Sequence, residues 1–305
     1  MPQTLSPFRY PGGKTQLYSF VEHLLVENGI NGTYIEPFAG GAGLPIKLLH
    51  NNIVNNVWIN DYDKSIYSVW YAILHHPDQL ISRINEVPFD YYDNVNSTTK
   101  DFTNLEYWKS IKNLYLKEKN YQSSIDNAFA TLYLNRTNRS GIITGGPLGG
   151  LSQSNTKIFA RFNKKTLINK INLIHSHSDR IKLTRKNALD MVPQIRESVD
   201  QDNSFIFFDP PYYDQGNNLY YSSFDSIGHD NMSKSILSMT NYNWITTYDK
   251  SPQISELYSV ATQKFEYQIR YSANNSKRGN APELMFASPR LNISSVGNVH
   301  LHELK

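Results

Sequence analysis

The run FIFFDPP at residues 205–211 constrains the fold of this chain more than any other feature. Its four consecutive apolar strand-formers predict a strand that is buried on both faces, as in a parallel sheet covered by helices. The two prolines cannot continue the strand, because neither has a backbone N–H to donate to a neighbouring strand. The strand therefore ends at Asp209, whose carboxylate lies at the carboxyl edge of the sheet. In an open α/β sheet, ligands bind at this edge.

Two motifs in the N-terminal part of the chain repeat this placement. IEPFAGGAG at residues 35–43 puts a glycine-rich loop at the end of one predicted strand, and NDYD at residues 60–63 puts Asp61 at the end of the next. The succession of strand, glycine loop, helix, strand, acid and helix predicts the start of a doubly wound parallel sheet. The predicted elements here are strands at 33–37 and 56–60 and helices at 15–27, 44–51 and 62–75, with a further helix opened by Pro77.

The middle of the chain has a different character. Residues 105–117 and 125–138 have helical patterns, whereas the polar residues 93–103 and the glycine-rich residues 140–150 predict loops. We therefore expect an α/β, Rossmann-like sheet built from residues 1–84 and 181–305, with a mostly helical insert at residues 85–180. The later part of the sheet is predicted as strands at 181–184, 205–208 and 243–247, a helix from Ala188, and a hairpin of residues 267–271 and 283–287.

Charge is unevenly distributed along the chain. The net charge is only +3, but eleven lysines or arginines lie between Arg136 and Lys186 against one acid, Asp179. This pattern is typical of a solvated basic helix face, and equally of a surface that binds the phosphates of a nucleic acid. Charge alone leaves both interpretations open.

The chain contains no cysteine, which excludes several kinds of chemistry. Disulfides, thiolate nucleophiles and cysteine-ligated zinc are ruled out, and with them the zinc-dependent base deaminases. Methylation at the 5-carbon of cytosine is also disfavoured, because that reaction uses a cysteine nucleophile. We predict no metal site. The beginning MPQTLSPFRY lacks the apolar core of a signal peptide and no apolar run is long enough to span a bilayer, so we expect a cytoplasmic protein with no membrane partner.

Three motifs each allow a plainer alternative. YPGGKT at residues 10–15 is not a phosphate-binding P-loop, because Phe8 occupies the place of the required first glycine and no clear strand precedes it. Its glycines can still expose backbone N–H groups to an anion at a helix start, beside Lys14. FAGGAG lacks the spacing of a dinucleotide fingerprint and is also compatible with a tight turn that binds nothing. The DPPYY segment could be a turn followed by core tyrosines.

Asp61 completes the argument for a ligand. An acid at a strand end about 20 residues after a glycine loop suits the diol of a ribose. Alternatively it caps the following helix, although Asp63 can take that role instead. Together, the glycine loop and Asp61 indicate an adenosine without a pyrophosphate, which favours S-adenosyl-methionine over a nicotinamide cofactor.

In combination, FRYPGGK, YIEPFAGGAG, NDYD and DPPYY, in this order, resemble the DNA adenine methyltransferase family typified by the bacterial GATC methylase, in the alpha group of the DPPY amino-methyltransferases. YLNRTNRSG at residues 133–141 resembles the segment that leads into the DNA-contacting loop of that family. ITTYD at 245–249 and PELMFA at 282–287 resemble later elements. The sequence after Gly141 departs from the GATC methylase, so the resemblance implies the chemistry and not the recognition sequence.

This resemblance implies transfer of a methyl group from S-adenosyl-methionine to the 6-amino group of an adenine flipped out of double-stranded DNA. In such a site, Asp209 and the carbonyl of Pro210 accept hydrogen bonds from the amine, and Tyr212 stacks on the base. It also implies a catalytic domain at residues 1–84 and 181–305 and a target-recognition domain at 85–180. The implied cofactor residues are Tyr10, Lys14, Glu36, Phe38, Ala39, Gly40, Gly41, Asp61 and Asp209. We predict DNA contacts by Asn138, Arg139, Ser140, Arg161, Lys164, Lys277 and Arg278.

Alternative functions stay open at this point. The enzyme could be an orphan methylase or the modification half of a restriction system, with the cognate endonuclease as a separate chain. Its substrate could be adenine in RNA or another planar amine, such as a glutamine side chain. A catalytically inactive nucleic-acid-binding protein is disfavoured by the intact Asp209, Pro210 and Tyr212. We expect a bacterial or phage-encoded protein that associates with the nucleoid through DNA.

Overall fold

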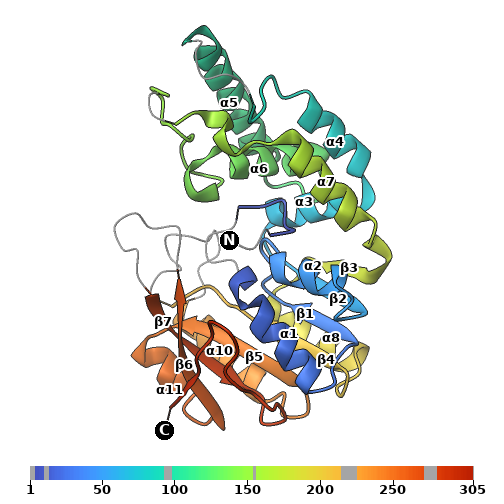
Figure 1. Cartoon of the computed structure of the whole chain (residues 1–305), viewed down its shortest axis with the longest axis vertical. Helices are drawn as coiled ribbons and strands as arrows, with labels where there is room; N and C mark the ends of the chain where they lie inside the picture. Colours follow the sequence, from blue (N-terminus) through green and yellow to red (C-terminus); the bar gives the residue numbers. More distant parts are fainter. Residues whose placement is uncertain are drawn as a thin grey trace. The chain divides into compact units, whose positions relative to one another are not determined.

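The computed structural model describes residues 4–9, 14–92, 98–153, 156–213, 225–270 and 280–304. The chain divides into two compact units. The sheet unit consists of Met1–Thr4, Gly12–Tyr62 and Arg180–Lys305, and the helical unit consists of Leu5–Pro11 and Asp63–Asp179. Each is described by itself below (Figure 1).

The sheet unit is built around one mixed β-sheet. Within the described residues its strand order is β3-β2-β1-β4-β5-β7-β6-β8. The first five strands in this order run parallel, whereas β7, β6 and β8 pair antiparallel to their neighbours. This arrangement confirms the predicted α/β, Rossmann-like sheet. The strands are β1 (Thr33–Glu36), β2 (Asn56–Asn60), β3 (Ile181–Thr184), β4 (Ser204–Phe208), β5 (Asn243–Asp249), β6 (Gln263–Arg270), β7 (Asn280–Ala287) and β8 (His302–Glu303).

The direction in which successive strands are added to the sheet changes at β1. The chain passes from β1 to β2 on one side, and β4 lies on the other, in register through Thr33 with Ser204 and Ile35 with Ile206. Because β1, β2 and β4 are parallel, their carboxyl ends meet at one edge. At such a switch point an open α/β sheet binds its ligand.

Helices cover both faces of this sheet (Figure 1). On one face, Met191, Ile195, Met232 and Ile236 pack with strand residues such as Ile206 in a buried apolar cluster. Every residue of β4 is buried, as the apolar run predicts for a strand between two helical layers. The helices are α8 (Ala188–Ser198), α10 (Ser226–Leu237) and α11 (Pro252–Leu257) on that face; η1 (Lys14–Leu17), α1 (Tyr18–Glu27) and α2 (Gly43–His50) complete the unit.

The helical unit fills the connection from β2 to β3. Its central helix α6 is buried along most of its length, and the ring of Tyr133 contacts those of Phe89, Tyr107, Phe129 and Phe162. The helices of this unit are α3 (Lys64–His75), α4 (Pro77–Asn85), α5 (Thr98–Glu118), α6 (Ile125–Thr137) and α7 (Lys164–His175), with short 3-10 turns η2 (Arg139–Gly141) and η3 (Ile158–Arg161); η4 (Ser178–Arg180) ends at the start of β3. No helix in the described ranges is both long and apolar enough to cross a membrane.

The structure corrects some of the predicted elements. Residues 93–103 were expected to form a loop; residues 93–97 lie outside the described ranges, and from Thr98 the chain is already in α5. Further along α5, Leu105, Trp108 and Ile111 are buried at helical spacing, and this tertiary packing outweighs the weak helix propensity of the preceding polar residues. Helices α7, α10 and α11 were not predicted. The late hairpin is confirmed and is longer than expected, because β6 and β7 pair from Gln263 with Ala287 onward.

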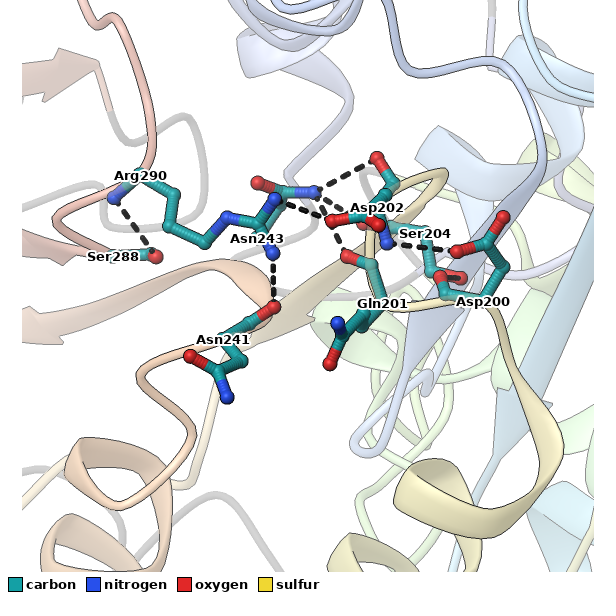
Figure 2. Close-up of polar contacts among 8 residues, drawn as sticks. All are labelled: Asp200, Gln201, Asp202, Ser204, Asn241, Asn243, Ser288 and Arg290. Atoms are coloured by element: carbon teal, nitrogen blue, oxygen red, sulfur yellow. Dashed lines mark hydrogen bonds and ion pairs between the residues drawn. The ribbon is translucent and has the colours of Figure 1, made fainter.

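The amino edge of the sheet is held by a polar network (Figure 2). The buried Asn243, at the start of β5, donates its amide hydrogens to the carbonyls of Gln201, Asp202 and Ser204 at 3.3, 3.4 and 3.1 Å. Arg290, beyond β7, donates to Asp202 Oδ1 at 2.5 Å and to the carbonyl of Asn241. These bonds join the turn that precedes β4 to β5 and to the segment after β7.

Candidate active site at the carboxyl edge of the sheet

Asp209 lies directly after β4, at the end of the buried strand. Thr247 of β5 donates its hydroxyl to Asp209 Oδ1 at 3.0 Å, and the Lys14 ammonium lies 3.3 Å from the same oxygen. The Asp209 side chain remains 26% exposed. The carboxylate is therefore fixed in position by the protein and still accessible to another molecule.

Lys14 is buried and surrounded by polar partners. Its ammonium donates to the Tyr212 hydroxyl at 2.7 Å and to Glu283 Oε2 at 3.3 Å, in addition to its ion pair with Asp209. It also lies 5.0 Å from the centre of the Tyr212 ring. The resemblance implied that Lys14 binds the cofactor, and the structure shows that its ammonium already pairs with two carboxylates of the protein.

Glu283 is the residue that the sequence analysis did not select. It lies on β7, opposite Tyr267 of β6, and its side chain is 1% exposed. Its carboxylate accepts hydrogen bonds from the Tyr212 hydroxyl, the Tyr267 hydroxyl and Lys14. The available signal was an acid within PELMFA, since a charge in an otherwise apolar strand needs a partner.

Burial and neighbouring charges shift the pKa values of Asp209 and Lys14. Burial raises the pKa of Asp209 to about 6, with a further increase from Glu283, while Lys14 and the Thr247 hydrogen bond act in the opposite direction. Burial alone would lower the pKa of Lys14, but Asp209 and Glu283 together raise it above its usual value. With all three side chains ionised, the group holds one more negative than positive charge.

Glu36 adds a second buried acid at the end of β1. It accepts a hydrogen bond from the Tyr34 hydroxyl at 3.0 Å. Burial raises the pKa of Glu36 well above its usual value, and the charge of Asp209 adds to the increase. The pKa of Tyr34 is raised by burial as well.

The glycine loop after β1 is tied to the end of β2. The backbone N–H of Gly40 donates to Asp61 Oδ2 at 2.8 Å, and the N–H of Ala39 donates to the carbonyl of Asn60 at 2.9 Å. Gly40 has a φ of 47°, in the left-handed region that favours glycine. The Asn60 amide donates to the carbonyls of Pro37 and Lys186, so this corner is held by the strands on both sides.

Asp63, and not Asp61, caps the helix that follows. Its carboxylate accepts from the backbone N–H groups of Ser65 at 2.7 Å and Ile66 at 3.1 Å. This confirms the alternative cap that the sequence suggested. Asp61 is only partly buried and is directed at the glycine loop instead.

The structure thus brings most of the selected residues of the sheet unit to one edge. Pro210 is buried, and Phe38, Tyr212 and Asp61 are partly buried. Three selected residues, Tyr10, Lys277 and Arg278, lie outside the described ranges. The residues at the ends of the neighbouring strands β1, β2 and β4 are Glu36, Phe38, Ala39, Gly40, Gly41, Asp61, Asp209, Pro210 and Tyr212.

Comparison with known proteins identifies the family. Residues 10–272 match the family described as D12 class N6 adenine-specific DNA methyltransferase. This chain belongs to that family. It is therefore an adenine-specific DNA methyltransferase, as the resemblance of its motifs implied.

Individual relatives agree with this assignment. The D12 methyltransferase is 26% identical over 217 residues to the type II methyltransferase M.MjaIII of Methanocaldococcus jannaschii, covering 68% of this chain and 69% of the relative. It is 24% identical over 300 residues to the type II methyltransferase M1.LlaDCHI of Lactococcus lactis subsp. cremoris, covering 92% and 94%. Among solved structures, the rRNA methyltransferase aviRa from Streptomyces viridochromogenes superposes with a TM-score of 0.41 at 12% identity, covering 92% of this chain and 87% of that one. The fold assignment rests on the strand order and not on this last likeness.

In the helical unit of the methyltransferase, Asn138 is fully buried. Its side-chain oxygen accepts from the Trp108 indole at 2.8 Å, and its amide donates to the carbonyls of Ile142, Ile143 and Gly145. Asn138 therefore shapes the loop that follows α6. A direct contact with DNA would require it to give up these bonds.

The other selected residues of this unit differ in exposure. Arg139, Ser140 and Arg161 are exposed, and Ser140 has a φ of 53°. Lys164 is partly buried, and its ammonium donates to the carbonyls of Asn85 at 2.9 Å and Val87 at 2.5 Å. The charge of Lys164 is thus partly used to hold the protein together, whereas Arg139 and Arg161 face solvent.

Part of the basic stretch that begins at Arg136 forms a cluster of cations in the same unit, which Arg9 joins from the start of the chain. Arg136 donates to the carbonyl of Arg161 at 2.9 Å, Arg9 to that of Asn138 at 3.0 Å, and Lys170 to that of Ser6 at 2.9 Å. Burial, reinforced by the neighbouring cations, lowers the pKa of Arg136 to about 10 and that of Lys170 to about 8. Among the described residues, no carboxylate forms an ion pair with Arg9, Arg136, Arg161 or Lys170.

Proposed function

We propose that this D12 methyltransferase transfers the methyl group of S-adenosyl-methionine to the 6-amino group of an adenine that is flipped out of double-stranded DNA. The observation that carries this proposal is the fixed yet accessible carboxylate of Asp209 at the end of β4, followed by Pro210 and the partly buried Tyr212. A base inside a duplex is out of reach of such a group, so the adenine has to leave the stack.

The carboxyl edge of the sheet fits the cofactor. Asp61 lies beside the glycine loop, where a carboxylate suits a ribose diol and backbone N–H groups can approach the adenosine closely. The excess negative charge of Lys14, Asp209 and Glu283 complements a cationic ligand. When bound, S-adenosyl-methionine supplies a methyl group on a positively charged sulfur. If the Lys14 ammonium contacts the methionine end of the cofactor, it does so while also bound to Asp209 and Glu283.

The side chains of the protein then prepare the amine. Asp209 accepts one hydrogen bond from the 6-amino group, and the carbonyl of Pro210 accepts the other. Two acceptors draw the nitrogen lone pair out of conjugation with the ring, and the rigid diproline keeps them in place before the reaction. A pKa of about 6 leaves Asp209 mostly ionised at neutral pH, as an acceptor must be. Stacking on Tyr212 contributes about 1–3 kcal/mol per base.

The methylated amine must finally lose a proton. The product nitrogen is positively charged and strongly acidic, so its proton can leave after the methyl group has arrived. Asp209 is the nearest candidate acceptor in this proposal, and its raised pKa suits a transient proton carrier.

The cation cluster of the helical unit supports binding of the DNA backbone. Arg9, Arg136 and Lys170 are partly buried without carboxylate partners among the described residues, and Arg161 is exposed beside them. Uncompensated cations of this kind are stabilised by anions, and DNA presents a regular row of phosphates. The type II names of the relatives favour the modification half of a restriction system, with a separate endonuclease chain, over an orphan enzyme.

The proposal is tested by incubating the protein with methyl-labelled S-adenosyl-methionine and unmethylated plasmid DNA. We expect label in N6-methyladenine after digestion of the DNA to nucleosides. Parallel incubations with RNA and with glutamine-containing peptides examine the alternative substrates. Label that enters RNA or peptide but not DNA would contradict the proposal, and mapping the modified adenines gives the recognition sequence.

DNA binding is tested through its salt dependence. Arg161→Gln should weaken binding to all DNA sequences alike and reduce the slope of log affinity against log salt by about 0.9, the contribution of one phosphate contact. Lys234→Gln is the matched control, because Lys234 is exposed on α10 and paired with Asp230. A loss confined to one DNA sequence would assign Arg161 to base recognition instead.

A further inference from the structure

Glu283 is a buried carboxylate to which the chemistry above gives no task beyond its share of the negative charge of the site. It accepts hydrogen bonds from three side chains that belong to three separate segments: Lys14 of η1, Tyr212 after β4, and Tyr267 of β6. Burying a carboxylate is costly unless its partners compensate for the lost water. Of the three donors, Tyr212 belongs to the proposed adenine site and Lys14 to the proposed cofactor site, so the arrangement is more than the β6–β7 hairpin needs to pair.

We propose that Glu283 is a positioning residue for methyl transfer, which fixes the Tyr212 ring and divides the charge of Lys14 between itself and Asp209. The inference rests on the proposed function, in which Asp209 and Tyr212 contact the adenine. Glu283 itself does not touch the substrate in this account. It acts through the two residues that do.

The first part of this role is geometric. The Tyr212 hydroxyl is held between the Lys14 ammonium, which donates to it at 2.7 Å, and Glu283, to which it donates. The backbone N–H of the next residue, Tyr213, donates to Asp249 Oδ1 at 3.0 Å. Both ends of the Tyr212 residue are therefore anchored before any base arrives, which reduces the entropy lost on stacking.

The second part is electrostatic. Glu283 and Asp209 both lie 3.3 Å from the Lys14 ammonium, so neither carboxylate has this cation to itself. The negative charge of Glu283 raises the pKa of Asp209, and Lys14 lowers it. Without the charge of Glu283, Lys14 would bind Asp209 more strongly, and the carboxylate would be a weaker acceptor for the adenine amine. Among the described residues, the titratable groups that exchange electrostatic effects with Asp209 include Lys14, Glu283, Glu36, Tyr34 and Tyr248.

Two substitutions separate these effects. Glu283→Gln removes the charge and keeps the size of the side chain, whereas Glu283→Asp keeps the charge and withdraws it from Tyr212. Glu266→Gln is the matched control, because Glu266 lies on the neighbouring strand, pairs with Lys250, and is not among the groups that shift the pKa of Asp209. Methylation kinetics give kcat and KM as functions of pH. Carbon-13 NMR titration of the Asp209 carboxyl group, without cofactor or DNA, gives its pKa directly.

We expect Glu283→Gln to lower kcat about tenfold or more, the scale of a displaced reacting group, with KM for the cofactor changed much less. The pKa of Asp209 and the acid limb of the rate profile should both move to lower pH. Glu283→Asp should lower kcat while leaving the acid limb in place, and Glu266→Gln should change neither. If Glu283→Gln does not fold, Glu283→Asp still tests the geometric part of the proposal. A lower kcat in that variant supports the need for Glu283 to fix the Tyr212 ring, and an unchanged kcat contradicts it.

Other outcomes would overturn the inference. If both Glu283 variants lose only thermal stability, with kcat, the acid limb and the Asp209 titration unchanged, then Glu283 supports the hairpin alone. Failure of the proposed function looks different, because the wild-type protein would then not methylate adenine in DNA. The cofactor-free titration of Asp209 in wild type and Glu283→Gln would still report whether Glu283 controls that carboxylate.

Discussion

The two ends of the sheet use polar groups in opposite ways. At the carboxyl end, the buried Lys14 and Glu283 and the partly exposed Asp209 form a group with unequal numbers of positive and negative charges. At the amino end, the neutral amide of Asn243 satisfies three backbone carbonyls, and the ion pair of Arg290 with Asp202 is largely exposed (Figure 2). Both ends join the same strands, β4 and β5.

In the proposed mechanism, the polar groups at the amino end stabilise the sheet, whereas those at the carboxyl end take part in the reaction. A neutral amide that bonds to buried carbonyls satisfies groups that would otherwise be left unpaired, and it carries little electrostatic cost. Buried charges are costly, and they shift the pKa values of their neighbours. Perturbed pKa values gather at functional sites, and the raised pKa of Asp209 is in line with the proposal that the carboxyl end is the end that reacts.

The largest effect is expected from Asp209→Ala. This change should abolish methylation, because it removes the acceptor that orients the amine, and it should leave the protein folded, because Lys14 keeps Glu283 as a partner. Labelled-methyl transfer and circular dichroism measure the two properties. Asp202→Ala at the amino end is the matched control and should retain full turnover. Turnover by Asp209→Ala within about tenfold of wild type would remove the distinction between the two ends.

The pH dependence should show the same contrast. The pKa of Asp209 is raised to about 6, so its acceptor form is lost as the pH falls through 6, and the rate should fall about tenfold per unit below that value. Stability responds in the opposite direction. Because the folded state holds this proton more tightly than the unfolded state, the contribution of Asp209 to the free energy of unfolding increases as the pH falls from about 6 towards 4. A rate that is unchanged from pH 7 to 5 would show that Asp209 does not act as an ionised acceptor.

The sequence predicted the carboxyl end well for a local reason. An apolar run followed by glycines, an acid or prolines marks the end of a strand, and parallel strands bring such ends together. Asp61, Asp209 and the glycine loop were found in this way, and Asp63 as a helix cap follows from the same kind of local rule. The placement of these residues at one edge of the sheet could therefore be predicted from local sequence patterns and the parallel direction of the strands.

Groups formed by distant segments could not be predicted in this way. Glu283 reaches Lys14 across 269 positions of the chain, and Lys170 reaches the carbonyl of Ser6 across 164. Asn138, at the end of a predicted helix, was expected to contact DNA, because nothing in its immediate sequence shows that Trp108 and three carbonyls will surround its amide. Such roles depend on tertiary packing, which the local pattern does not contain.

Asn243→Ala should produce the largest change at the amino end. It leaves the carbonyls of Gln201, Asp202 and Ser204 without their shared donor, at a cost of about 1–3 kcal/mol in the free energy of unfolding. The midpoint of urea denaturation measures this loss, and kcat at a temperature where the variant is folded should match wild type. Asn241→Ala, at an exposed asparagine two residues earlier, is the control and should change neither quantity. A lower kcat for Asn243→Ala would mean that the amino end also positions the reacting groups.

The smallest effect is expected from Asp202→Asn. The Asp202 side chain is 66% exposed, so its ion pair with Arg290 is screened by water and contributes at most about 1 kcal/mol to stability. Arg290 also retains its hydrogen bond to the carbonyl of Asn241 in this variant. The urea midpoint, measured at low salt and at ~1 M salt, should differ from wild type only at low salt, because mobile ions screen an exposed pair. A loss as large as that of Asn243→Ala, and insensitive to salt, would show that the amino end depends on charge as the carboxyl end does. The contrast between a neutral, stabilising end and a charged, reactive end would then have to be abandoned.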